Sequence, residues 1–235
     1  MIEKYDDPRL NKILSKSISH HDKWIDLINE HNQSRFTDDG DFNSKRDNLS
    51  HVEKAASVLG EISELFFKYG AFRDSFDNGK MLISLFGPDL IIESKKTQSK
   101  YYFGINEKGI YLSTSLKHFE NLRYIDDSFW QDLLSLFDFG EFEYDEDEFF
   151  GREIQKKHHD LFLPKKSVIY RMFRSYFISH TEHCDHILNG TLKITWTAEH
   201  HFENIIAEGC LAFKILYQLN YTLWKVYDLK RKSNK

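Results

Sequence analysis

Residues 80–115 read KMLISLFGPDLIIESKKTQSKYYFGINEKGIYLSTS, and this stretch decides the fold. It contains four runs rich in β-branched, aromatic and other apolar residues, which is typical of strands. The expected strands are 80–86, 89–94, 101–106 and 110–115. Turn-length links join the first pair at Gly87-Pro88 and the second pair at Gly109. Because parallel neighbours need a long crossover, such short links predict an antiparallel β-meander.

Apolar residues at helical spacing flank this expected sheet on both sides along the chain. The expected helices are 8–32, 50–70, 116–137, 165–188 and 198–230. The predicted buried stripe of the first helix consists of Leu14, Ile18, His21, Ile25 and Ile28. Residues 33–48 are polar and are expected to form an exposed loop. Ser50 and Glu53 form a capping-box pattern that predicts the start of the second helix, and Gly70 predicts its end.

A further strand is expected at 191–197, where Leu192, Ile194 and Trp196 alternate with polar residues. Such alternation indicates one buried face, so this strand can join the meander. The predicted fold class is therefore α+β, an antiparallel meander packed with N-terminal and C-terminal helices. We expect a single globular domain over residues 1–235, and the one candidate sub-boundary is the acidic segment 138–153.

The cysteine content and the absence of long apolar stretches set the expected location. Two cysteines, Cys184 and Cys210, make no disulfide framework, which favours a reducing cytoplasm. The first residues lack the apolar stretch of a signal peptide. No run reaches the ~18 apolar residues that a membrane-spanning helix requires. We therefore expect a soluble cytoplasmic protein that does not bind membranes.

The negative charge of the chain is concentrated in one segment. The formal net charge is −5, but residues 138–153 hold eight acidic residues and a single base, Arg152. Aromatic residues interleave with the acids: residues 137–150 contain six aromatics and seven acids. Charge can steer such a segment to a basic surface of another protein, and aromatics can anchor it there. The alternative is a solvated loop whose aromatics pack back onto the core.

The predicted partner-binding residues are Phe142, Tyr144, Asp145, Glu146, Asp147, Glu148 and Phe149. The net negative charge argues against nucleic acid as the direct ligand.

Histidines form a second cluster of chemical interest. Seven of the 12 histidines lie within residues 158–201. Imidazole and thiolate are zinc ligands, so the alternative to a cofactor-free protein is a Zn²⁺ site. Its candidate ligands are His180, His183, Cys184 and His186, completed by His158, His159, His200 or Glu203. The chain has neither an HExxH motif nor paired CxxC motifs, and the other reading is histidines at the surface or satisfied in the core.

The stretch from Arg174 to His180, RSYFISH, resembles the Arg-x4–6-His motif of HEPN-type ribonucleases. The resemblance implies a metal-free attack on RNA, with Arg174 and His180 as the catalytic pair in a dimer. Two other pairs, Arg46–His51 and Arg152–His158, match the Arg-x4–6-His pattern as well. The strands expected at 80–115 also depart from the all-helical plan of that family.

Two hypotheses for the function follow. The first is a non-catalytic protein-interaction protein, such as an accessory subunit, an inhibitor or immunity-type protein, or a regulator. The second is a histidine-dependent nuclease or hydrolase that uses residues 158–203. The sequence contains no phosphate-binding loop, dinucleotide fingerprint or nucleophile elbow, which favours the first hypothesis and a protein without a cofactor. The sequence leaves the oligomeric state open.

Overall fold

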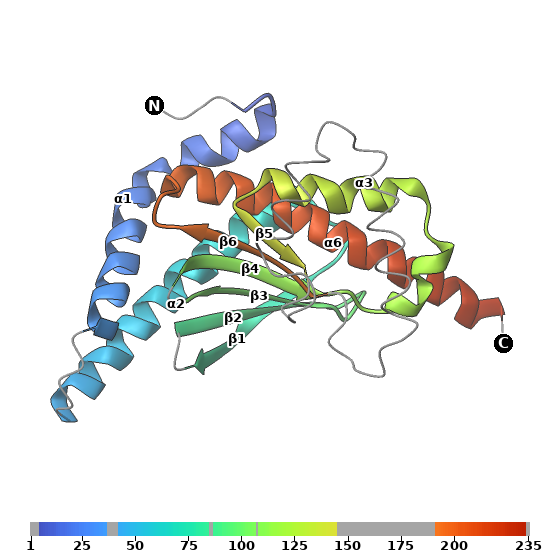
Figure 1. Ribbon diagram of the computed structural model, residues 1–235. Helices are drawn as coiled ribbons and strands as arrows, with labels where there is room; N and C mark the ends of the chain where they lie inside the picture. Colours follow the sequence, from blue (N-terminus) through green and yellow to red (C-terminus); the bar gives the residue numbers. More distant parts are fainter. Residues whose placement is uncertain (1–4, 37–41, 85–86, 107, 145–190, 234–235) are drawn as a thin grey trace.

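A computed structural model describes residues 5–36, 42–84, 87–106, 108–144 and 191–233, and it confirms the α+β class (Figure 1). The described elements are α1 (Pro8–Phe36), α2 (Phe42–Gly70), β1 (Phe76–Ser84), β2 (Gly87–Ser94), β3 (Lys100–Ile105), β4 (Gly109–Ser115), the short 3-10 helix η1 (Phe119–Tyr124), α3 (Asp127–Ser135), the 3-10 turn η2 (Leu136–Asp138), β5 (Glu141–Tyr144), β6 (Thr191–Thr197) and α6 (Phe202–Ser233). No described helix is long and apolar enough to cross a membrane.

The described strands form one antiparallel sheet in the order β1-β2-β3-β4-β6-β5. The meander predicted from residues 80–115 is confirmed, and β6 joins it as expected. β6 enters between β4 and β5, so β1 and β5 form the two edges (Figure 1). At the start of β4, Gly109 has a φ of 150°, and a Cβ there would lie 2.0 Å from the carbonyl oxygen of Trp196. Only glycine fits this close approach of two backbones.

The main core lies between the sheet and the helices α2 and α6. The ring of Phe66 on α2 lies 5.0 Å from that of Phe103 on β3 and 5.5 Å from that of Phe213 on α6. Gly209 permits this close helix packing, since a Cβ there would lie 3.0 Å from the Phe66 ring. Aromatic packing from three elements therefore fixes how α2 and α6 sit on the sheet.

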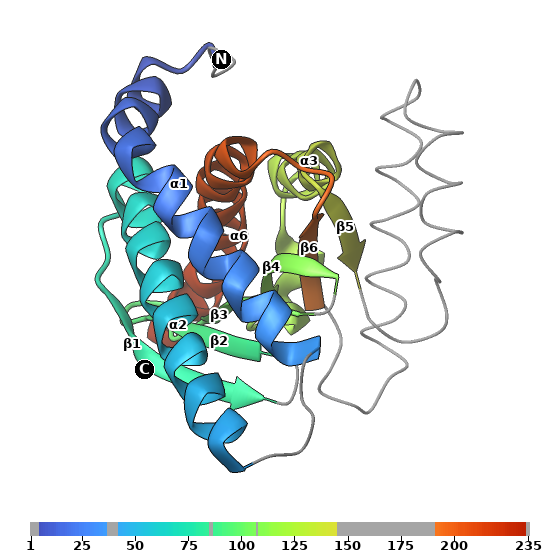
Figure 2. The same cartoon turned by 90° about the vertical axis from the view of Figure 1, so that its left-hand side faces the viewer.

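Helix α1 packs across α2 and beside α6, as Figure 2 shows. Its buried residues recur at alternating steps of four and three, the spacing of helix–helix seams. They are Leu10, Leu14, Ser17, His21, Trp24, Ile28 and His31. The predicted stripe was wrong at Ile25, which is 37% exposed, while the side chain of Ile18 lies outside the described part. Trp24 sets this register because its larger ring is buried and its Nε1–H donates to Glu61 Oε2 at 2.7 Å.

Two predicted boundaries were also wrong. Residues 33–36 and 42–48 are helical, and α2 begins at Phe42 rather than at Ser50. Residues 42–49 contain neither glycine nor proline, so no residue there interrupts the helix, and the capping-box pattern is only a local signal. A solvated loop was the alternative for the acidic run, yet its residues Glu141–Tyr144 form the strand β5, paired to β6. The one-domain prediction stays a prediction.

The end of α2 at Gly70 was predicted correctly, but the left-handed residue is the next one, Ala71, with a φ of 44°. Its N–H donates to Phe67 O at 3.0 Å, which is a helix C-cap bond. Gly70 is required for another reason, because a Cβ there would lie 2.0 Å from the ring of Phe72.

We expect Ala71→Gly to raise the free energy of unfolding by about 0.5–1 kcal/mol, because glycine adopts positive φ without the strain of a Cβ. Urea denaturation followed by far-UV circular dichroism measures the change. Ser57→Gly, at an exposed interior position of α2, is the matched control and should cost about 0.5 kcal/mol. Equal destabilisation by both glycines would show that the strain at position 71 is not significant.

Candidate functional site

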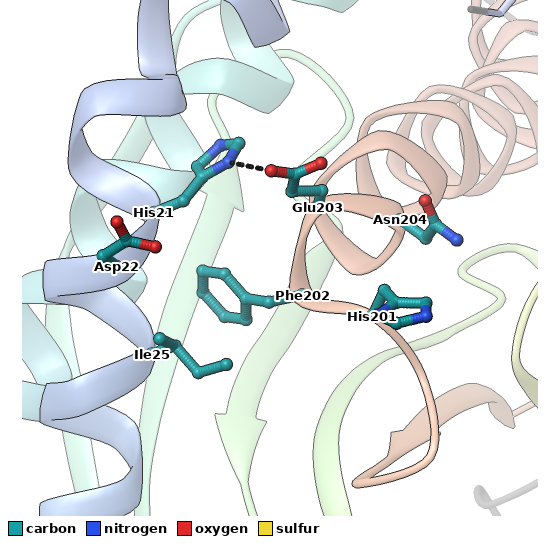
Figure 3. A pocket seen from close by; sticks show the side chains of 7 residues that line it. All are labelled: His21, Asp22, Ile25, His201, Phe202, Glu203 and Asn204. Carbon is teal, nitrogen blue, oxygen red and sulfur yellow. Dashed lines mark ion pairs between the residues drawn. The ribbon is translucent and has the colours of Figure 1, made fainter. Parts of the chain in front are cut away.

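A hollow of about 440 Å³ lies between α1 and the N-terminal end of α6 (Figure 3). This volume is within the range of small-ligand sites. Helix α1 contributes His21, Asp22 and Ile25 on its side facing α6. The other side is formed by four consecutive residues at the start of α6, His201, Phe202, Glu203 and Asn204. The site therefore combines two imidazoles, two carboxylates, an amide and two apolar side chains.

His21 is the buried polar side chain of this pocket, only 4% exposed, and its ring is held on two sides. Its Nδ1 lies 3.5 Å from Glu203 Oε1, and Figure 3 shows the ring directed at this carboxylate. Its Nε2 lies 3.2 Å from the hydroxyl of Ser17, one turn earlier on α1. The ring also meets Phe202 edge-on, with centroids 6.3 Å apart. His21 thus links α1 to the first turn of α6.

Ser17 and Glu203 hold the two ring nitrogens of His21. The Ser17 hydroxyl donates to Leu14 O at 3.1 Å, the bond that serine commonly makes inside a helix. The same hydroxyl lies within hydrogen-bond distance of His21 Nε2. Nδ1 faces the Glu203 carboxylate and has no hydrogen bond of its own.

Serine, histidine and glutamate in this order also occur in hydrolase triads. The geometry here does not support that chemistry, because Ser17 is buried and is not among the residues that line the pocket. Its hydroxyl hydrogen points to Leu14 O rather than to the histidine that would act as its base. A nucleophile needs the opposite polarity and access to a substrate.

The charge of the pocket is set by its two carboxylates. Glu203 stands in the first turn of α6, where the partial positive charge of the helix end favours an anion. Asp22 is exposed at the opposite wall. Among the described lining residues there is no lysine or arginine. Within the described ranges, no three histidine, cysteine or acidic side chains come together to hold a metal ion.

Four of the sequence-predicted site residues lie in the described part of the chain: Phe142, Tyr144, His200 and Glu203. The Nδ1 of His200 accepts a hydrogen bond from the N–H of Thr197 at 3.2 Å, and Glu203 lines the pocket. Phe142 is 7% exposed and meets the Phe137 ring edge-on, with centroids 4.8 Å apart. It belongs to the core, so its assignment to a partner-binding surface was wrong: on β5 it points to the same side as Ile194, its buried neighbour on β6. Tyr144 is the last residue of β5.

The other predicted residues lie outside the described ranges. They are Asp145, Glu146, Asp147, Glu148, Phe149, Arg174, His180, His183, Cys184 and His186. The zinc site and the ribonuclease pair therefore stay predictions. The other cysteine, Cys210, is buried on α6, and burial raises the pKa of its thiol well above the ordinary range. A neutral, inaccessible thiol is not a nucleophile.

Sequence reasoning assigned His21 to a buried stripe and Glu203 to the zinc alternative, and it did not bring the two together. One signal was present: a histidine in a helix stripe is a polar group that needs a partner when buried. The identity of that partner depends on how α1 packs against α6, which no local pattern encodes. Comparison with protein-family models, with curated proteins and with solved structures found no match to this chain.

Proposed function

We propose that this chain is a non-catalytic protein-interaction protein, an accessory subunit, inhibitor or regulator, whose acidic and aromatic segment docks on a basic surface of another protein. The observation that carries the proposal is the position of β5. It contains Glu141 and Glu143, two acids of the run, and forms an edge of the sheet, paired in the described part of the chain to β6 alone (Figure 2). The acidic run therefore includes a strand at the edge of the sheet.

On β5, the side chain of Phe142 and the acidic side chains point to opposite faces of the sheet. Phe142 points into the core, and successive side chains of a strand point to opposite faces. Glu141 and Glu143 therefore lie on the face of the sheet opposite to α2 and α6, paired with Thr195 and Lys193 of β6. This arrangement supports a docking segment whose aromatic side chain holds it to the core and whose acidic side chains lie on the opposite face of the sheet.

A contact to α6 holds the beginning of this strand. Glu208 Oε2 accepts a hydrogen bond from the N–H of Gly140 at 3.1 Å and another from Trp196 Nε1 at 2.7 Å. Gly140 has a φ of 42°, and a Cβ there would lie 2.8 Å from Thr195 O. The turn before β5 is thus tied to both β6 and α6, and such preorganisation reduces the entropic cost of binding a partner.

The test is a triple charge reversal, Glu146→Lys, Asp147→Lys and Glu148→Lys, in the full chain. We expect loss of the partner that co-purifies with the unaltered protein from its native host, and that partner should have a basic surface. Because charge steers the encounter, the association rate of the unaltered pair should fall steeply as salt increases. Biolayer interferometry with the purified pair measures both effects.

The matched control reverses three exposed acids elsewhere, Asp26→Lys, Glu53→Lys and Glu199→Lys, which changes the net charge by the same amount. This control should keep the partner. If the triple reversal in the run retains every partner with unchanged affinity, the acidic run is not the docking segment.

A further inference from the structure

We infer that the pocket between α1 and α6 binds a cationic group carried on an apolar stem, that is, an alkyl ammonium or alkyl guanidinium. This inference does not depend on the proposed docking role of the acidic run, since the pocket is built from other residues. Three features of the pocket indicate this class of ligand: its carboxylates, its buried histidine and its apolar side chains.

The charge of the pocket selects a cation. Among its described lining residues, Asp22 and Glu203 are the carboxylates, and His21 and His201 are the imidazoles. The buried ring of His21 contacts Ser17 on one side and Glu203 on the other. Asp22 has no ion pair in the described part of the chain, and the second oxygen of Glu203 stays available to a ligand. A guanidinium or ammonium donates to carboxylates through short, charge-assisted bonds.

His21 is the buried polar side chain of the pocket, and it contacts Glu203. Its Nδ1 is buried, directed at Glu203 Oε1 from 3.5 Å, and makes no hydrogen bond of its own. A buried polar atom of this kind is uncommon in a folded protein, and it points toward the site rather than into the core. The contact with the His21 imidazole orients the Glu203 carboxylate at the pocket, so a cation would meet an oriented acceptor.

The apolar side chains of the pocket favour a ligand whose cationic group is attached to an alkyl chain. Ile25 is exposed on α1 although it is one of the larger apolar side chains, and it lies across the pocket from Phe202 (Figure 3). An alkyl chain lying on Ile25 would remove exposed apolar surface of that side chain from water, next to the buried ring of Phe202. Asn204 closes the site, with its Oδ1 accepting a hydrogen bond from Tyr5 at 3.4 Å.

Two sources could supply this group, a free alkyl amine or guanidine and the lysine or arginine side chain of another protein. Calorimetric titration of the full chain separates them, with agmatine as the free probe and acetyl-Gly-Arg-Gly-amide as the side-chain probe. We expect saturable binding of agmatine. Binding of both probes identifies the site as one that also accepts a protein side chain, and binding of agmatine alone identifies a free-ligand site.

The double variant Asp22→Asn and Glu203→Gln keeps the size and hydrogen-bonding capacity of both side chains and removes their charge. It should weaken agmatine binding by about 10-fold or more, since two charge-assisted contacts are lost. Asp26→Asn, one turn further along α1 and outside the pocket, should bind as the unaltered protein does. Circular dichroism confirms that each variant is folded.

Three results would overturn the inference. They are the absence of saturable binding with either probe, equal binding of valerate, an anion with a similar stem, and unchanged affinity in the folded double variant. Loss of a protein partner on charge reversal in the acidic run would have no bearing on these measurements.

Discussion

Replacing Phe213 by alanine should lower the free energy of unfolding by about 3–5 kcal/mol, the largest effect we expect from a single substitution. The side chain is fully buried at the centre of an aromatic cluster that joins α2, α6 and the sheet. Ring centroids within 4.9–5.7 Å of it belong to Phe66, Phe67, Phe72, Phe76 and Tyr101. The substitution removes these contacts and leaves a cavity that surrounding rings on three elements cannot collapse to fill.

Thermal denaturation provides the measurement. For a chain of this size the loss corresponds to a fall in Tm of about 6–20 °C. Leu229→Ala is the matched control, because this leucine lies near the end of the same helix and is 59% exposed. It should change the stability by less than about 0.5 kcal/mol. Similar losses in both variants would contradict the placement of Phe213 at the centre of the core.

Replacing Glu208 by alanine should cost about 2–4 kcal/mol. The carboxylate accepts from the buried indole of Trp196 and from the backbone of Gly140, and alanine leaves the indole N–H without a partner. Glu208→Gln keeps an oxygen acceptor without the charge, so it should lose only about 1–2 kcal/mol. The Glu208→Gln variant gives the effect of the charge, and its difference from Glu208→Ala gives the combined effect of the acceptor oxygen and the side-chain length.

Hydrogen exchange of the Trp196 indole N–H, followed by NMR, checks the local effect, and urea denaturation gives the stability. Protection should fall strongly in Glu208→Ala and stay substantial in Glu208→Gln. Because the same carboxylate holds the turn before β5, the alanine variant should also weaken binding of the partner proposed for the acidic run. Equal behaviour of the two variants would mean that the acceptor oxygen has no structural role.

Much of the secondary structure could be predicted because it depends on neighbours in the chain. The strands in 80–115 and at 191–197 have alternating or continuous apolar residues and are bounded by turn residues, and each lies within a few residues of its prediction. Turn-length links also fixed the antiparallel pairing of β1 to β4, since a short link leaves no other geometry. Local patterns were less reliable at helix ends: the Ser50 pattern did not stop α2 from extending back to Phe42.

For the acidic run, local sequence patterns were not sufficient to predict the structure. Its composition left two alternatives open, a docking segment and a solvated loop whose aromatics pack back onto the core, and no local pattern decided which applied to Phe142. The pairing of β5 with β6 decided this, because the register places Phe142 opposite Ile194 on the core side. Pairing between strands that are far apart in the sequence depends on the completed sheet.

The sequence by itself determined the α+β class, the meander and most of the helices, because periodicity, turn chemistry and link length act over a few residues. Only the tertiary structure decided that β6 lies between β4 and β5, that α1 buries Ser17 and His21 while leaving Ile25 exposed, and that His21 meets Glu203. These outcomes come from packing between distant segments. On α1, burying the large ring of Trp24 is more favourable than burying the neighbouring Ile25. The ring therefore determines which face of the helix points to the core.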